Sequence, residues 1–378
     1  KVGQKNLKDK EVKNLKIEDT SQSLNFVLLI LMLNNVTSKL IAFLPAYSNP
    51  GNNSFTSMEV DLNLTKTQSG MVSGVTFALT SGIFSLASGI IVDRYSRKWT
   101  LITSGLLWGG LTFLQSFSTD FMSFLIPRIL TETATAACGA ASISLIGDLF
   151  NSESKARANA IFMIGLYIGI ATSSLAIISI NNIGWRNTYR LIGLISIFIT
   201  IITLYIKEPA RGRFNNASKK KIMEKLEKSG SSFQKTLNEA KFVLQNSLFL
   251  LLCAASSLRF FGGYAMGFWG AKFFQKEFPD YQTEYSLING ISIFVFAMSS
   301  SYIAGYISDK YSKSNPEIKA LLGGYGSLIA FPLVAASFTL GANFWISMLA
   351  YSASLFPGEL WMGPAYVIIQ DLFPSEIC

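Results

Sequence analysis

Five charged side chains lie inside stretches of sequence that are otherwise apolar. They are Lys39, Arg128, Glu132, Arg259 and Glu359. Each would cost on the order of 3 kcal/mol facing lipid, so such residues face a hydrated cavity or a partner instead. Arginine favours bidentate contact with oxyanions, and a buried carboxyl group can take up a proton. The set therefore predicts a central site that binds an anionic group, with Glu132 or Glu359 as the carrier of any coupled proton.

The spacing of these charges also suggests pairs. Arg128 and Glu132 are four residues apart and share one helix face, and Arg259 is expected to face Glu359. Static pairs that only hold helices together are the alternative. Three cations against two anions leave a mildly positive site. Aromatic side chains follow Arg259 closely: Phe260, Phe261, Tyr264, Phe268 and Trp269. This mixture favours an amphiphile with an anionic head, or an organic anion.

The sequence lacks the residues that other kinds of chemistry would require. The chain has no histidine, so it offers no histidine base and no histidine metal ligand. Cys138, Cys253 and Cys378 do not have metal-ligand spacing, and inert buried thiols are the expectation for the first two. No glycine-rich phosphate loop follows a strand. We expect no metal, no cofactor and no enzymatic activity. The net charge of +9 reflects membrane topology more than binding to nucleic acid.

Two motifs occur twice. GIIVDRYSRK at 89–98 returns as GYISDKYSK at 305–313, and DLFNSE at 148–153 returns as DLFPSE at 371–376. A chain that repeats itself in this way consists of two copies of one helical unit, which in a membrane is typical of alternating-access transporters. The motifs define a predicted inner latch in which Arg94 or Arg97 pairs with Asp148 and the pair breaks in one state. Its candidate residues are Gly89, Asp93, Arg94, Arg97, Asp148, Gly305, Asp309, Lys313 and Asp371.

The elements that must position these residues are long apolar helices. Half of the residues are hydrophobic and 15% are charged, and a membrane span needs about 20 apolar residues in a helix. No run shows the alternation of a membrane strand. We therefore predict an all-α, polytopic membrane protein with ten spans. They lie near 24–46, 66–91, 98–117, 121–149, 156–180, 186–206, 246–272, 285–307, 318–340 and 343–372.

Basic residues predict the orientation and the division of the chain. The polar tail, 1–20, carries six lysines, and the stretch from Lys207 to Lys241 carries ten lysines or arginines. Both are therefore expected on the cytoplasmic side. The predicted units are the tail 1–20, a six-helix bundle over 21–206, a linker over 207–245 and an incomplete second bundle over 246–378. Helical spacing of apolar residues in the linker predicts an amphipathic helix at the membrane surface.

The motif at 89–98 resembles the signature loop of the major facilitator superfamily. Further stretches are similar to its spinster branch: DRYSRKW at 93–99, SLIGDLF at 144–150, GWR at 184–186 and KEPARG at 207–212. The resemblance implies a twelve-helix fold of which the last two helices are absent here, so the sequence is either a fragment of a longer chain or a ten-helix remnant. It also implies that the first, fourth, seventh and tenth helices line the central cavity, and these carry the five charges. Thr37-Ser38 and Thr135 stand where the branch carries an Asp-Arg pair and a Glu.

Together these features predict a secondary transporter or facilitator for a lysolipid-like, sphingoid-phosphate-like or other organic anion. The alternative is a degenerate transporter retained as a structural subunit of a larger membrane complex. The expected partners of the transporter are membrane lipids and a small-molecule or lipid substrate, and a larger membrane complex is the partner under the alternative. We expect the protein in the plasma membrane or in an endolysosomal or vacuolar membrane rather than in the mitochondrion.

Overall fold

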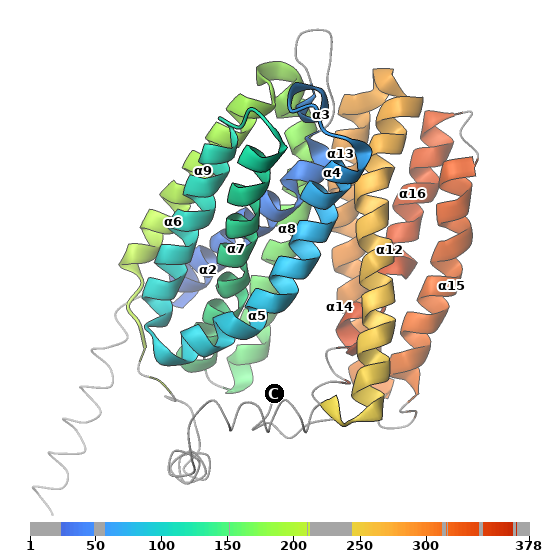
Figure 1. Ribbon diagram of the computed structural model, residues 1–378. Coiled ribbons are helices and arrows are strands. Elements are labelled where there is room, and N and C mark those ends of the chain that lie inside the picture. Colours follow the sequence, from blue (N-terminus) through green and yellow to red (C-terminus); the bar gives the residue numbers. More distant parts are fainter. Residues whose placement is uncertain are drawn as a thin grey trace, which may run out of the picture.

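The computed structural model describes residues 24–48, 57–150, 152–209, 244–311, 317–339 and 343–365, with residues 211, 315 and 368. All regular structure in these ranges is helical. The helices form two bundles that lie side by side, the first in blue to green and the second in yellow to red (Figure 1). The predicted tail, the linker helix, Lys313 and Asp371 lie outside these ranges. Of Asp93 and Asp309, only the helical backbone is described.

The first bundle begins with a helix that tightens at its outer end. α2 (Leu24–Phe43) continues into the 3₁₀ turn η1 (Leu44–Tyr47) at Pro45. The second span comprises α4 (Lys66–Gly70), a π-helical turn η2 (Met71–Val75) and α5 (Thr76–Arg94). The remaining elements are α3 (Met58–Asp61), α6 (Arg97–Gln115), α7 (Phe121–Leu149), α8 (Ser152–Ile183), α9 (Trp185–Ile202) and the short η3 (Thr203–Tyr205).

The second bundle repeats part of this plan. Its elements are α12 (Ser247–Glu277), η4 (Pro279–Tyr281), α13 (Gln282–Ser292), the π-helical turn η5 (Ile293–Ala297), α14 (Met298–Tyr311), α15 (Ile318–Thr339) and α16 (Phe344–Gly358). A π-helical turn thus interrupts one span in each bundle. α16 ends at Gly358, although the sequence predicts an uninterrupted helix from 343 to 372.

Polar residues mark several of the helix starts. Asp120 forms a capping box at the start of α7, and Thr65 forms one at the start of α4. Asn246 caps α12, and Asn343 caps α16. Such side chains accept hydrogen bonds from backbone N–H groups that have no partner in the helix. Gly184 separates α8 from α9 with a φ of 81°, which favours glycine because it has no Cβ.

Seven helices in the described part are long and apolar enough to cross a membrane. The segments from Lys66 to Arg94, from Arg97 to Gln115 and from Phe344 to Gly358 run alongside them (Figure 1). Large apolar side chains cover the outside of both bundles; Leu258, Phe261 and Phe331 are about three-quarters exposed. Such a surface is suited to lipid and not to water. The chain is an integral, multi-pass membrane protein.

Glycines let the helices of the first bundle pack closely. A Cβ on Gly169 would lie 2.6 Å from the Val36 carbonyl oxygen and 2.7 Å from Lys39 Cβ, and a Cβ on Gly165 would lie 2.9 Å from the Met32 carbonyl oxygen. The two glycines are one turn apart on α8. They allow its backbone to approach α2, as small residues do in membrane proteins. This contact fixes the part of α2 that carries Lys39.

Candidate functional site in the central cavity

The residues of the predicted inner latch cluster around Arg97, which is 1% exposed. Arg97 forms an ion pair with Asp148 at the end of α7. Its Nε lies 3.4 Å from Glu208 Oε1, and its backbone N–H donates to the same oxygen at 2.8 Å. Nη2 donates to the Pro209 carbonyl at 2.9 Å. The sequence predicted the pairing with Asp148, but Glu208 was recognised only as part of a family-like stretch.

Glu208 is held in its ionised form by this cluster. Partial burial raises the pKa of Glu208, but hydrogen bonds from the Ser96 hydroxyl and from the Arg97 backbone and side chain outweigh it. The resulting pKa lies below the ordinary value of 4.5. Arg211 adds hydrogen bonds to the carbonyls of Val92 and Tyr95 at the end of α5. The described cluster therefore ties the inner ends of α5, α6 and α7 to the segment after α9.

The described partners of Arg97 belong to the first bundle and to the segment after α9. That the Arg97–Asp148 pair opens and closes with the transport cycle stays a prediction. Arg94 is exposed. Gly89 does not mediate close helix contact here, because a Cβ on it would meet nothing within 4 Å. A Cβ on Gly305 would likewise meet nothing within 4 Å; the close approach at this point depends on Gly363, where a Cβ would lie 3.1 Å from the Gly305 backbone nitrogen.

Arg128 and Glu132 form a fully buried pair inside the first bundle. Both are 0% exposed, and Arg128 Nη1 lies 2.7 Å from Glu132 Oε1. Arg128 also donates to the carbonyls of Ile41 at 3.0 Å, Ala42 at 2.6 Å and Val72 at 3.3 Å. These carbonyls lie where α2 tightens into η1 and where η2 interrupts the second span. The arginine thus satisfies backbone groups that irregular helix leaves without partners.

A cavity of about 220 Å³ lies between the two bundles. Lys39 of α2, Arg259 of α12 and Glu359 after α16 are the charged residues that line it. Arg128 and Glu132 are not among its lining residues, because the arginine is turned towards the carbonyls of its own bundle. The structure therefore brings three of the five predicted charges together and places the other two in the packed interior.

The three charges in the cavity have different surroundings. Lys39 Nζ makes no hydrogen bond or ion pair with any residue that the structure describes, although it is close enough to Glu132 to act on it electrostatically. Arg259 donates through Nε and Nη2 to the Gly358 carbonyl, the former at 3.0 Å. The expected ion pair between Arg259 and Glu359 is not formed. The cavity therefore presents one unpaired cation and one carboxyl group.

Aromatic rings form a wall of the cavity. Phe43 stacks on Tyr264 with ring centroids 5.6 Å apart, and Tyr264 stacks on Phe260 at 6.2 Å. Phe260 meets Trp361 edge-on at 4.9 Å. Phe43 belongs to the first bundle and the other three to the second, so the wall crosses the interface. Trp361 and Phe43 had no distinguishing signal in the sequence.

Neutral polar residues join the bundles on the outer side of the cavity. Ser286 Oγ donates to the Ser174 carbonyl at 2.8 Å, and Ser174 Oγ donates to the Ser286 carbonyl at 3.1 Å. Asn289 Nδ2 donates to Ser174 Oγ at 2.9 Å and to Tyr47 Oη at 3.2 Å. Nearer the outer surface, Lys272 pairs with Glu59. The sequence pattern did not single out any of these residues.

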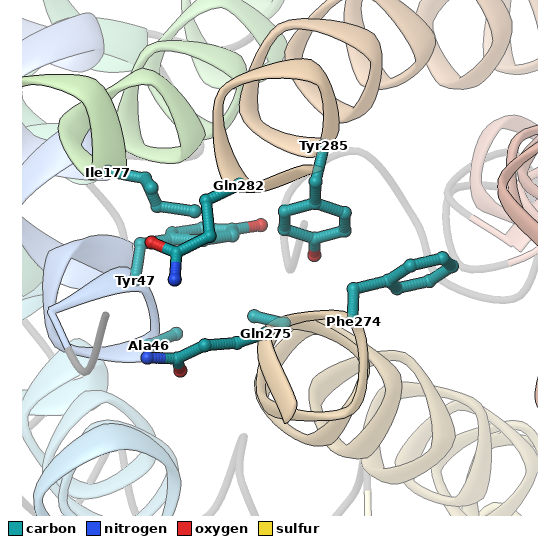
Figure 2. A pocket seen from close by; sticks show the side chains of 8 residues that line it. Ala46, Tyr47, Ile177, Phe274, Gln275, Gln282 and Tyr285 are labelled. Atoms are coloured by element: carbon teal, nitrogen blue, oxygen red, sulfur yellow. The ribbon is translucent and has the colours of Figure 1, made fainter. Parts of the chain in front are cut away.

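The packing at this level leaves very little space. Figure 2 shows side chains from η1, α8, α12 and α13 converging on a void of about 10 Å³, among them Tyr47, Ile177, Phe274 and Tyr285. That is the space of roughly one water molecule. In the described part of the chain, the polar contacts between the two bundles lie at the depth of Tyr167 or closer to the outer surface of the protein. The outer side is therefore closed.

Two apolar helix bundles around a charged central cavity define an integral membrane protein with the architecture of a solute carrier. The sequence matches the family description "Major Facilitator Superfamily" over residues 26–377. The chain therefore belongs to the major facilitator superfamily, a family of transporters and not of enzymes.

Within this superfamily the chain is similar to spinster proteins, as the sequence resemblance implied. It is 23% identical to protein spinster of Drosophila melanogaster over 336 residues, which cover 84% of this chain and 51% of that protein. It is also 23% identical to spinster homolog 1 of Xenopus tropicalis, covering 82% and 60%. The chain thus spans about half of the length of the curated relatives it matches.

A solved structure shows the same fold. It is a bacterial homologue of the human lysosomal transporter spinster in an inward-facing, unoccupied conformation. The TM-score is 0.76 at 19% identity, and the match covers 94% of this chain and 77% of that one.

Proposed function

We propose that this protein moves an amphiphilic or organic anion across a membrane by alternating access. The observation that carries the proposal is the central cavity, with the half-buried Lys39, which has no partner among the described residues, on one bundle and Arg259 on the other. Holding a cation inside the membrane is costly unless an opposite charge joins it. Lys39 and Arg259 against the carboxyl group of Glu359 leave an excess of at least one positive charge among the described residues of the cavity wall.

The aromatic wall supports an amphiphile as the substrate. Phe43, Tyr264, Phe260 and Trp361 provide a continuous apolar surface beside the charged residues. Ligand sites combine apolar walls with a few placed polar groups in this way. A lysolipid-like or sphingoid-phosphate-like molecule would lay its chain along these rings and its anionic head against Lys39.

The closed outer side supports alternating access. The contacts of Ser174, Ser286 and Asn289 close that side, while the inner cluster around Arg97 stays within one bundle. A substrate in this state would reach the cavity from the cytoplasmic side. Rocking one bundle against the other would open the outer contacts and expose the same cavity to the opposite side.

Uptake into liposomes by the purified full chain tests the proposal. The panel consists of lysolipids, sphingoid phosphates, neutral sugars and short organic anions. Charge-assisted hydrogen bonds contribute about 1.5–3 kcal/mol, so Lys39→Ala should weaken apparent affinity for an anionic substrate about tenfold to a hundredfold. Lys39→Arg should retain most of it. If no compound in the panel moves, the transport proposal is wrong and the structural-subunit alternative stands.

The location of the protein is part of the proposal. The relatives named above include homologues of a lysosomal transporter, which supports an endolysosomal or vacuolar membrane alongside the plasma membrane. Imaging of the tagged full chain against markers of both membranes distinguishes them. A mitochondrial signal would contradict both.

A further inference from the structure

The end of α16 leaves a backbone carbonyl without a helical partner inside the membrane. α16 ends at Gly358, and helical backbone resumes at Met362. The last carbonyls of a helix have no intrahelical donor, and lipid supplies none. Arg259 fills this role for Gly358 through both Nε and Nη2.

Close packing by α15 maintains the interruption. A Cβ on Gly326 of α15 would lie 2.4 Å from the Pro357 carbonyl oxygen, and a Cβ on Gly323 would lie 3.1 Å from Trp361 Cβ. The helix backbones therefore touch on both sides of the interruption. Trp361, just after it, contributes its ring to the cavity wall. Interrupted helices that line a cavity are typical of substrate and coupling sites in transporters.

Glu359 is the residue that follows the clamped carbonyl. Its carboxyl group lines the cavity and makes no hydrogen bond or ion pair within the described residues. Because the Gly358 carbonyl belongs to the peptide bond that leads to Glu359, Arg259 can reach either acceptor by rotating its side chain. The titratable or charged neighbours that line the same cavity are Lys39, Tyr47, Tyr167, Tyr264 and Tyr351.

We propose that Arg259 exchanges between the Gly358 carbonyl and the Glu359 carboxylate as Glu359 loses and regains a proton. This proposal rests on the transport function proposed above and assigns proton coupling to α16. In the proposed protonated state Glu359 is neutral, Arg259 holds the carbonyl and α16 stays interrupted; the structure shows the last two of these features. When Glu359 releases its proton to the solvent, an ionised carboxylate inside the membrane requires a cation, and Arg259 leaves the carbonyl.

The exchange makes the shape of α16 depend on one proton. Once Arg259 leaves, the Gly358 carbonyl needs a new donor, and continuation of the helix through residues 359–362 supplies one. Glu132 cannot act in the same way, because Arg128 already holds it among the carbonyls of Ile41 and Ala42. Arg259 is therefore a positioning residue and Glu359 is the proton carrier.

Distances between spin labels on the inner ends of the two bundles test this inference in the full chain. Tyr95 and Tyr306 are 67% and 58% exposed, so Tyr95→Cys and Tyr306→Cys offer label sites once the exposed Cys253 and Cys378 are replaced by serine. We expect the distance distribution of the unmutated pair to change with pH. Glu359→Gln should hold it at the low-pH distribution, whereas Glu359→Asp should keep the pH response. Arg259→Gln should abolish the response, and Arg259→Lys should restore part of it.

Glu284→Gln is the control, because Glu284 is a carboxyl group of α13 outside the cavity lining; it should leave the pH response in place. A response that survives in Glu359→Gln, or that is absent from the unmutated pair, would overturn the inference. The readout needs no substrate. Failure to move any anion would therefore refute the proposed function while leaving the pH response intact, and the two failures are distinguishable.

Discussion

At the scale of single residues, Arg128 and Arg259 show how membrane charges are stabilised by backbone as well as by opposite charge. Arg128 contacts one carboxylate and three carbonyls, and Arg259 contacts one carbonyl through two N–H groups. In both cases the carbonyls lie at interruptions of helices. The guanidinium group suits this role because it offers five donors in a fixed plane.

Arg128 should be needed for stability rather than for binding. Removing one partner of a buried ion pair costs about 3–5 kcal/mol, because the other charge is left unpaired. Arg128→Gln should therefore lower the thermal unfolding midpoint of the protein in nanodiscs markedly. Lys39→Gln, which removes a cation without a described partner, should leave the midpoint nearly unchanged. Equal midpoints for the two variants would contradict this assignment.

Glu208 should make the inner cluster sensitive to acid. Its pKa is lowered in the folded protein, so its contribution is present above the unfolded value and is lost as the pH falls through the folded pKa. Because this pKa is lowered, the cluster should weaken below pH 4.5, which is the ordinary pKa of a glutamate side chain. It should not change as the pH rises above neutral. Thermal unfolding as a function of pH checks this; Glu208→Gln should flatten the acid limb, and an unchanged limb would refute it.

At the scale of elements, helices approach each other closely where glycine leaves room for a neighbouring backbone. α8 approaches α2 at Gly165 and Gly169, whereas a Cβ on Gly139 of α7 would meet nothing within 4 Å. Small residues at such crossings allow backbone contact. The α8–α2 contact therefore sets where Lys39 stands in the cavity.

Substitution of Gly169 by alanine should push α8 away from α2. The new Cβ would lie 2.6 Å from the Val36 carbonyl oxygen, and overpacking of this kind costs about 1–3 kcal/mol. We expect a lower unfolding midpoint and a weaker apparent substrate affinity, because Lys39 is displaced. Gly139→Ala is the control and should change neither. If Gly169→Ala behaved like Gly139→Ala, the packing argument would be wrong.

At the scale of the whole molecule, the two sides of the protein are held by different kinds of contact. Outer contacts join the bundles through Ser174, Ser286, Asn289 and Tyr47. The described inner cluster around Arg97 joins elements of one bundle only. Neutral hydrogen bonds between membrane helices are weak, of the order of 1 kcal/mol. Contacts of this strength can break in each cycle.

A covalent bond in place of the outer contacts should stop that cycle. Ser174→Cys with Ser286→Cys, in a background with Cys253→Ser and Cys378→Ser, should form a disulfide under oxidation because the two serines exchange hydrogen bonds. Uptake should fall to background and recover on reduction. Each single cysteine variant is a control and should respond to neither treatment. Full transport by the cross-linked protein would mean that these contacts do not open.

The sequence alone determined the class of the protein. Apolar runs, basic connections and two repeated motifs predict a two-bundle membrane protein, because membrane insertion depends on local hydrophobicity and charge. The same reasoning placed charges on α2, α7, α12 and near α16, and this needed only the composition of each segment and the cost of a charge in lipid. The repeated motifs predicted that Arg94 or Arg97 pairs with Asp148, and the structure forms the pair with Arg97.

Only the tertiary structure decided which charges meet. Arg128 turns to carbonyls at Ile41 and Val72, dozens of residues away, and so leaves the cavity to Lys39, Arg259 and Glu359. The end of α16 at Gly358 likewise depends on the approach of α15 and on Arg259. Serine and asparagine at the outer closure carry no charge that would mark them. Which residues become partners depends on their distances in the folded chain. The residues next to each of them in the sequence do not determine these distances.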